Sequence, residues 1–279
     1  MSGLLIGLPI AALTLAVAGL LALRWLDGRH DRRVWAALRA QQPEAPALFD
    51  PAMVAALPEP ARRYFAFAIA PGTPLLTLAE IEMGGTFALG TNDQPNAGRM
   101  VARQILAGPR GFVWIMHSGT IGGSDGFSAT GSWTRFRLLG LLPVARLAFT
   151  ADHRRSAFGR AVAEALFWTP AALLPGPGIA WEAAGPDTAR VTVTQGDLSQ
   201  IVQITLRADG ALVSLVMPRW SNANLAKRWQ EQPFGATFGA NREWHGYCLP
   251  SEVNAGNFFG TPEYFAFYKA RVTRIRFPQ

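Results

Sequence analysis

The chain opens with a long apolar stretch and then changes to short segments of alternating character. Residues 3–23 carry no charge, and Thr14 is their one polar side chain. At a rise of about 1.5 Å per residue, a helix of this length spans roughly 30 Å, the thickness of a bilayer core. The pattern predicts a transmembrane anchor over residues 1–24, which makes the membrane the first predicted partner.

A cleaved secretory signal is the alternative interpretation of this stretch, because Ala16 and Ala18 are small residues of the kind found at cleavage sites. Signal sequences begin with a basic region, however, and Met1-Ser2-Gly3 contains no Lys or Arg, so a retained anchor is favoured.

Arginines lie after the end of the span, at positions 24, 29, 32, 33 and 39, and none lies before its start. The positive-inside rule therefore predicts a single-pass protein of the cell inner membrane whose folded domain lies in the cytoplasm. Cys248 is the one cysteine, so disulfide usage gives no evidence about the compartment. The periplasmic side stays open as the alternative.

Residues 25–72 are expected to form a helical linker. Val34 to Ala40 has the pattern of a short helix that Pro43 and Pro46 interrupt. Asp50 is a candidate cap for a second short helix, and the stretch 59–70 repeats apolar residues at helical spacing.

Residues 73–279 are rich in β-branched and aromatic residues between turn residues, which predicts an antiparallel β domain. Asp209-Gly210 predicts a hairpin, and Ser156 to Trp168 predicts one helix capped by Ser156. The expected fold class is α+β, mainly β: one large curved, half-barrel-like antiparallel sheet with a covering helix. Strands are expected at residues 76–89, 98–107, 111–118, 130–137, 179–184, 188–195, 201–207, 212–217, 236–246, 249–258 and 262–277.

Composition limits the chemistry. The chain is 49% hydrophobic and 16% charged, which allows a substantial core. The net charge is +7, but beyond the juxtamembrane stretch the sequence has no run of more than two consecutive basic residues. No nucleic-acid partner is therefore expected. The four histidines are scattered, so we predict no metal site. Gly119 to Gly126 is predicted to be a flexible β connection, so no cofactor is expected there or elsewhere. A protein partner is not identifiable.

The most informative polar residue is Glu164, which lies in an otherwise apolar helical stretch and needs a partner if it is buried. Arg160 lies four residues earlier and Trp168 four later, on the same helix face. The pattern fits an exposed Arg160–Glu164 pair, or a buried Glu164 that orders a pocket. With nine tryptophans in the chain, a pocket is expected to have Trp114, Trp168 and Trp181 as walls, with Arg103 and Glu164 as polar anchors.

Several motifs together carry a resemblance. They are residues 57–65, residues 111–114, and Glu164 to Pro175 in the pattern Glu-x-x-x-Trp-x-Pro-x-Ala-Leu-Leu-Pro. Over roughly residues 55–277 the chain resembles a bacterial family catalogued only as a domain of unknown function, which implies one domain and no particular chemistry. By element order it also resembles lipoprotein carriers, whose curved antiparallel half-barrel would imply an apolar cavity plugged by helices.

Three functions are therefore compared. The leading hypothesis is a non-enzymatic, membrane-anchored domain that binds a hydrophobic or lipid-like ligand between the sheet and the helix, with no catalytic residue. The second is a hydrolase or isomerase that uses Glu164 or His153 as acid or base. The third is a membrane-tethered scaffold for protein interactions.

Overall fold

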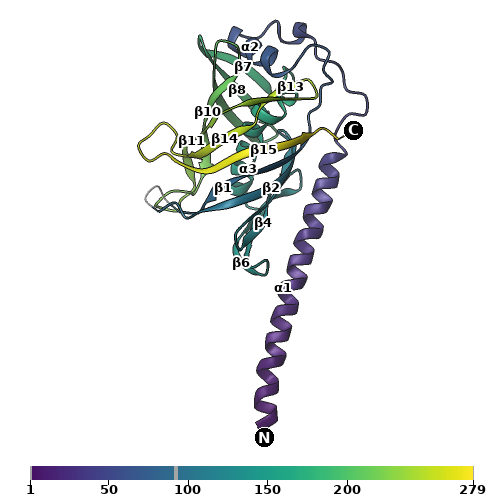
Figure 1. Cartoon of the computed structure of the whole chain (residues 1–279), viewed down its shortest axis with the longest axis vertical. Coiled ribbons are helices and arrows are strands. Elements are labelled where there is room, and N and C mark those ends of the chain that lie inside the picture. Colours follow the sequence, from purple (N-terminus) through teal and green to yellow (C-terminus); the bar gives the residue numbers. More distant parts are fainter. Residues whose placement is uncertain (1, 91–93, 279) are drawn as a thin grey trace.

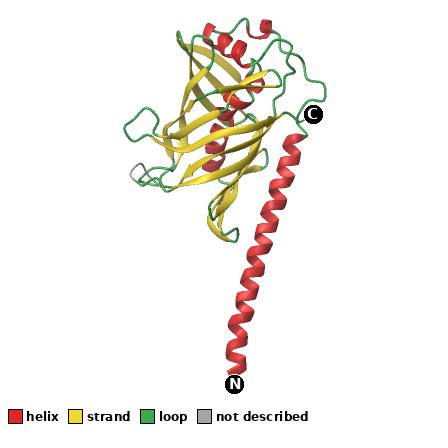
Figure 2. Ribbon diagram, in the orientation of Figure 1, coloured by secondary structure: helices red, strands yellow, loops and turns green. Residues whose placement is uncertain are grey.

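The architecture is dominated by one curved antiparallel sheet of 13 strands, as Figures 1 and 2 show. A computed structural model of the chain describes residues 2–90 and 94–278, and its side chains from Ile10 onward. The strand order is β6-β5-β4-β3-β2-β1-β15-β14-β11-β10-β9-β8-β7, and β12 and β13 form a separate hairpin. The mainly antiparallel fold class predicted from the sequence is confirmed.

The strand bounds are β1 Ala79–Ala88, β2 Ala97–Ala107, β3 Gly111–Ser118, β4 Ile121–Ser128, β5 Gly131–Leu138, β6 Leu142–Ala148, β7 Ile179–Gly185, β8 Thr188–Gln195, β9 Leu198–Leu206, β10 Leu212–Ser221, β11 Gln230–Phe238, β12 Asn241–Trp244, β13 Tyr247–Pro250, β14 Glu252–Asn257 and β15 Phe265–Arg276. The sequence patterns missed β4, β6 and most of β11, and the expected strands 236–246 and 249–258 each run across a break between two strands. The Gly-rich stretch that we expected to be a flexible connection is β4, because Cβ atoms at Gly123 and Gly126 would collide with Phe136 and Trp133 of β5.

Alternation along each strand divides the sheet into a concave and a convex face. On β3, Phe112, Trp114 and Met116 belong to the main core on the concave side. Val113 points the other way and belongs to a second, smaller apolar cluster, against which Ile115 packs. Both faces of this part of the sheet are therefore covered, as the near-continuous apolar sequence of β3 indicates.

Helix α3 (Ala151–Trp168) lies inside the curve of the sheet (Figure 2). It begins five residues before the predicted start, because the cap is Thr150, whose hydroxyl accepts a hydrogen bond from the backbone N–H of His153. Ser156 is buried within the helix, so its predicted capping role is wrong. The predicted end at Trp168 is confirmed, and the 3-10 helix η2 (Pro170–Leu173) follows.

The linker supplies a cover for one end of the sheet. Asp50 caps the 3-10 helix η1 (Pro51–Val54) by accepting from the N–H of Ala52, as expected. Helix α2 (Glu59–Ala68) follows, and the Tyr64 hydroxyl donates to the backbone oxygen of Leu166 at 2.5 Å. This contact ties α2 to the end of α3.

Helix α1 runs without interruption from Ser2 to Arg39 (Figure 1). The stretch from Val34, which we expected to form a separate short helix, is its C-terminal end. By length and composition, α1 is able to cross a membrane. The predicted domain boundaries at residues 24 and 72 stay predictions, although the helix passes through the first of them.

The C-terminal half of α1 docks on the convex face of the sheet. Its buried residues Asp27, Asp31, Val34 and Leu38 recur at helical spacing and so share one face of the helix. Val34 and Leu38 pack into the apolar cluster beneath β2, β3 and β5. This second interface, between a helix and the outside of the sheet, is the feature that the linker prediction lacked.

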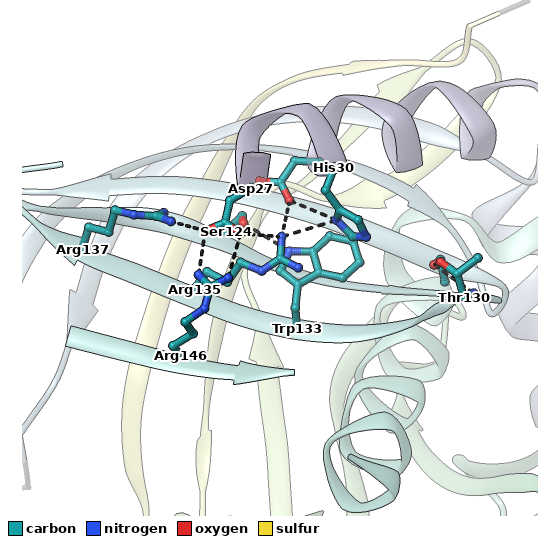
Figure 3. Close-up of polar contacts among 10 residues, drawn as sticks. Asp27, His30, Ser124, Thr130, Trp133, Arg135, Arg137 and Arg146 are labelled. Atoms are coloured by element: carbon teal, nitrogen blue, oxygen red, sulfur yellow. Dashed lines mark hydrogen bonds and ion pairs between the residues drawn. The ribbon is translucent and has the colours of Figure 1, made fainter. Parts of the chain in front are cut away.

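An arginine clamp, defined here as Asp27, Asp31, Arg135, Arg137 and Arg146, completes this docking. Figure 3 labels Asp27 and the three arginines. Asp27 accepts hydrogen bonds from Arg137 and, at 2.7 and 3.0 Å, from both terminal nitrogens of Arg146. Arg135 lies 3.5 Å from Asp27 and 3.6 Å from Asp31. One carboxylate of α1 thus joins both strands of the β5–β6 hairpin.

Candidate functional site

A partly open cavity of about 220 Å³ lies between α3 and the concave face of the sheet. Its walls come from both halves of the sheet, and most of them are apolar. The aromatic lining residues are Phe87, Trp114, Phe136, Phe167, Phe234, Phe267 and Tyr268. The polar ones are Asp125, Thr134, Arg160, Glu164 and Arg219. The cavity therefore combines an aromatic interior with a charged patch on one wall.

Arg160 of α3 organises that charged patch. Its Nε donates to Glu164 at 2.7 Å, and one terminal nitrogen donates to Asp125 of β4 at 2.6 Å. The other terminal nitrogen donates to the Gln104 side chain at 3.3 Å, and Gln104 in turn donates to Glu164. The guanidinium fork thus joins the helix to β2 and β4.

Burial lowers the pKa of Arg160, but the neighbouring Glu164 and Asp125 carboxylates outweigh burial and hold that pKa above its usual value. Both carboxylates are therefore committed to one cation. Of the two arrangements that the sequence left open, the buried Glu164 that helps to order a pocket is the one present, with Glu164 9% exposed.

Arg219 of β10 differs from Arg160 because it makes no hydrogen bond or ion pair to any residue that the structure describes. Its guanidinium lies over the ring of Phe234, with the central carbon 4.7 Å from the ring centroid. Burial, together with repulsion from Arg160, lowers its pKa to about 10, so Arg219 is still a cation at neutral pH. Its hydrogen-bond donors are available to an acceptor in the cavity.

A chain of hydrogen bonds extends the polar patch beneath the start of α3. Thr134 donates to Asp125 at 2.7 Å and lies 2.9 Å from Nε2 of His153, whose Nδ1 lies 2.7 Å from the Ser132 hydroxyl. Burial lowers the pKa of His153, and the nearby Asp125 only partly opposes it. His153 is therefore held neutral between two hydroxyl groups.

This arrangement predicts a loss of stability in mild acid. In the unfolded chain His153 takes up a proton near its ordinary pKa of 6.5, but in the folded protein it does so only at lower pH. The unfolded state then binds more protons, so the free energy of unfolding should fall as the pH drops below 6.5. Urea unfolding of the full chain in detergent should show a shallower fall for His153→Gln, and equal pH dependence of both proteins would contradict the prediction.

Trp114 and Glu164, two of the five predicted ligand-binding residues, line the cavity. Trp114 is 3% exposed, and its indole Nε1 donates to no acceptor among the described residues. The structure thus brings together the aromatic wall and the carboxylate that the sequence singled out.

Arg103 lies on the opposite face, so its expected position as a polar anchor in the concavity is corrected. It is paired with Ile115 across β2 and β3, and its guanidinium lies over Trp35 of α1 at 5.5 Å. There it borders outer grooves of about 790 and 720 Å³ beside α1. Its neighbour Gln104 faces Glu164 instead, because successive strand residues point to opposite faces.

Trp168 and Trp181 are absent from the lining of the cavity that the structure describes. Trp168 is completely buried at the end of α3 and packs edge-on against Phe167. Trp181 of β7 donates to the backbone oxygen of Leu173 at 2.9 Å and packs on Tyr64 of α2. Both hold the helices on the sheet, and their predicted role as walls is not supported by these positions.

The sequence analysis missed Gln104, Asp125 and Arg219. Asp125 lies in the Gly-rich stretch that gave no strand pattern, and Arg219 follows Pro218 in a stretch where no pairing signal is visible. One signal was present for Arg219: Leu215, Met217 and Arg219 alternate on the inner face of β10.

The cavity is not built like a metal centre. Across residues 2–90 and 94–278, no group of three or more His, Cys, Asp or Glu side chains could hold a metal ion. Within the cavity, Arg160 is the cation that both carboxylates bind. The arrangement suits an uncharged or anionic polar group next to an apolar body.

Residues 47–269 match the model of a family described as "Family of unknown function (DUF6544)". The chain belongs to this family. The resemblance that the motifs indicated is thereby confirmed, and the matched region includes every residue of the cavity and of its polar patch. No curated protein matches the chain.

Among solved structures, the chain is similar to a LolA superfamily protein, NE2245 from Nitrosomonas europaea, with a TM-score of 0.45 and 6% identity over 79% of this chain and 92% of that one. It is also similar to a putative outer membrane lipoprotein-sorting protein domain from Vibrio parahaemolyticus, with a TM-score of 0.34 and 12% identity over 72% of this chain and 85% of that one. These are the lipoprotein-carrier-like structures that the element order resembled.

Proposed function

We propose that this family member is a membrane-tethered domain that binds a small hydrophobic or lipid-like molecule in the cavity between α3 and the sheet. The observation that carries the proposal is the pairing of an aromatic interior with one unpaired cation, Arg219, in its wall. A ligand with a single apolar chain and one acceptor group fits both features. At about 220 Å³ the cavity lies below the range of drug-sized pockets, which favours a small ligand.

The charges on the cavity wall support an acceptor near Arg219 and not near Arg160. Arg160 already donates to Asp125, Glu164 and Gln104. The Nε of Arg219 and the Nε1 of Trp114 are buried donors without an acceptor among the described residues. A ligand carboxylate, phosphate or ester oxygen would satisfy such donors, and a buried donor left unsatisfied costs about 1–3 kcal/mol.

The binding test uses the full chain in detergent micelles and radiolabelled octanoic acid as the probe, because one short apolar chain with a single carboxylate suits a cavity of about 220 Å³. Ala255 of β14 lines the cavity and is 7% exposed, so Ala255→Phe should fill the space and abolish probe binding. Arg219→Met keeps the shape of the wall but removes the charged donor, and it should weaken binding about 10-fold to 100-fold, the value of a hydrogen bond to a charged group.

Ala183→Phe is the matched control, because Ala183 lies on β7 in an exposed position outside the cavity. Each variant is first checked for its free energy of unfolding, since overpacking costs typically 1–3 kcal/mol. Unchanged probe binding by a folded Ala255→Phe protein would overturn the proposal. This experiment does not test the two other hypotheses. An acid or base role of Glu164 or His153 and a scaffold role both stay predictions.

A further inference from the structure

The tip of the β5–β6 hairpin lies level with the end of the apolar half of α1. Leu139 and Gly140 at this tip border the same depression as Leu21 and Arg24 of the helix. A Cβ atom placed on Gly140 would lie 3.0 Å from a terminal nitrogen of Arg24. Figure 1 shows the hairpin extending from the domain along α1, toward the N-terminus of the helix.

The helix beyond this level has the length of a membrane span. Residues 2–23 precede Arg24 and at about 1.5 Å per residue extend about 33 Å, which matches the apolar thickness of a bilayer. Trp25, 56% exposed, lies at this level with Arg29 stacked on its ring at 5.3 Å. Trp and Arg at the end of a span are typical of the membrane–water interface.

The hairpin tip is apolar and exposed. Leu139 is 71% exposed, Leu142 49% and Val144 53%. β6 is the last strand of the sheet, so its outer edge has no neighbouring strand. In water, exposed apolar side chains on such an edge strand would favour association with other chains. Because the tip lies beside the end of the span, the interface of the same membrane can cover its apolar side chains.

The height of the tip relative to α1 is fixed by the arginine clamp (Figure 3). Asp27 binds Arg137 of β5 and Arg146 of β6, and Asp27 lies one helical turn after Arg24. The backbone N–H of Leu139 also donates to the oxygen of Thr120 at 2.7 Å, which joins the tip to the neighbouring β3–β4 turn. The tip cannot move away from the helix without breaking these contacts.

We propose that the β5–β6 hairpin tip, Leu138 to Val144, inserts into the interfacial layer of the phospholipid bilayer that α1 spans. The domain is then attached at two points, the helix and the hairpin, and its orientation to the membrane is fixed. The exposed apolar residues at the start of the edge strand β6, Leu142 and Val144, are then covered by lipid and withdrawn from water. This inference uses the membrane span and does not depend on the ligand proposed for the cavity.

The test uses the full chain in phosphatidylcholine nanodiscs that contain a phosphatidylcholine with a shallow doxyl quencher. Cys248→Ser removes the native thiol, and Leu139→Cys then carries an environment-sensitive fluorophore. Val213→Cys is the matched control, because Val213 is 40% exposed and follows the β9–β10 turn, which packs on α2. In Figure 1, α2 lies at the end of the domain opposite the hairpin.

In nanodiscs, the label at position 139 should emit at a shorter wavelength than the same fluorophore free in buffer. It should also lose most of its fluorescence to the quencher, whereas the label at position 213 should not. Adding Leu142→Glu should restore much of the fluorescence at 139, because a charge opposes insertion. An unquenched label at 139, equal quenching at both positions, or no effect of Leu142→Glu would each overturn the proposal.

Discussion

Replacing Arg160 with methionine is expected to lower the free energy of unfolding by about 3–5 kcal/mol, the usual cost of removing one partner from a buried ion pair. The side chains of Arg160, Asp125 and Glu164 are 16%, 19% and 12% exposed, so both carboxylates would lose their cation in a largely dry place. The side-chain oxygen of Gln104 would lose the donor that Arg160 supplies as well. Urea unfolding of the full chain in detergent micelles, followed by tryptophan fluorescence, measures this loss.

Arg154→Met is the control, because it makes the same change on the same helix. Arg154 binds Asp197 at 2.8 Å, but the Asp197 side chain is 74% exposed, and such pairs contribute about 0–1 kcal/mol. If charge is the cause, adding Asp125→Asn and Glu164→Gln to Arg160→Met should recover part of the stability. Similar losses for Arg160→Met and Arg154→Met would show that the buried cluster contributes no more than a surface pair.

The parts of the site that the sequence could predict are those fixed by local spacing. Arg160 and Glu164 are four residues apart on one helix, so their contact follows from helix geometry wherever the helix lies. The hairpin around Asp209-Gly210 was predictable for the same reason, since Gly210 has a φ of +93° and the turn needs a residue that tolerates it. Local geometry needs no knowledge of the tertiary fold.

The parts that sequence reasoning could not supply depend on which strands are neighbours and which face each residue presents. Gln104 and Arg103 are adjacent, and only the register of β2 with β3 decides that Gln104 reaches Glu164. Asp125 meets Arg160 because β4 lies two strands from β2, a neighbourhood that the Gly-rich pattern did not show. Arg219 approaches the site from the other half of the sheet.

Helix α1 shows a different limit of pattern analysis. The polar residues after Leu23 ended the predicted span and suggested a separate helical linker. In the structure, these residues continue the same helix, and Asp27 and Asp31 are buried against three arginines of β5 and β6. A carboxylate at a helical position carries no indication of a partner more than 100 residues away in the chain.

The second large effect is expected at this interface: Asp27→Asn should lower the free energy of unfolding by about 3–5 kcal/mol, because it leaves buried arginines without their main carboxylate. The side chains of Arg135 and Arg137 are only 5% and 9% exposed, and both approach Asp27. Asp31 remains, but of the three arginines of the clamp it pairs with Arg135 alone, at 3.6 Å. Hydrogen exchange should also rise at residues 27–39, since undocking of α1 exposes its amides to fraying.

Asp209→Asn is the matched control, since Asp209 pairs with Arg207 at the surface, where both side chains are more than half exposed. It should cost at most about 1 kcal/mol. Adding Arg137→Met to Asp27→Asn should restore stability in part, because it removes one of the uncompensated charges. If Asp27→Asn instead behaves like Asp209→Asn, with unchanged exchange at residues 27–39, the apolar contacts of Val34 and Leu38 hold α1 on the sheet without the arginine clamp. The hairpin tip would then owe its height beside the membrane to packing alone.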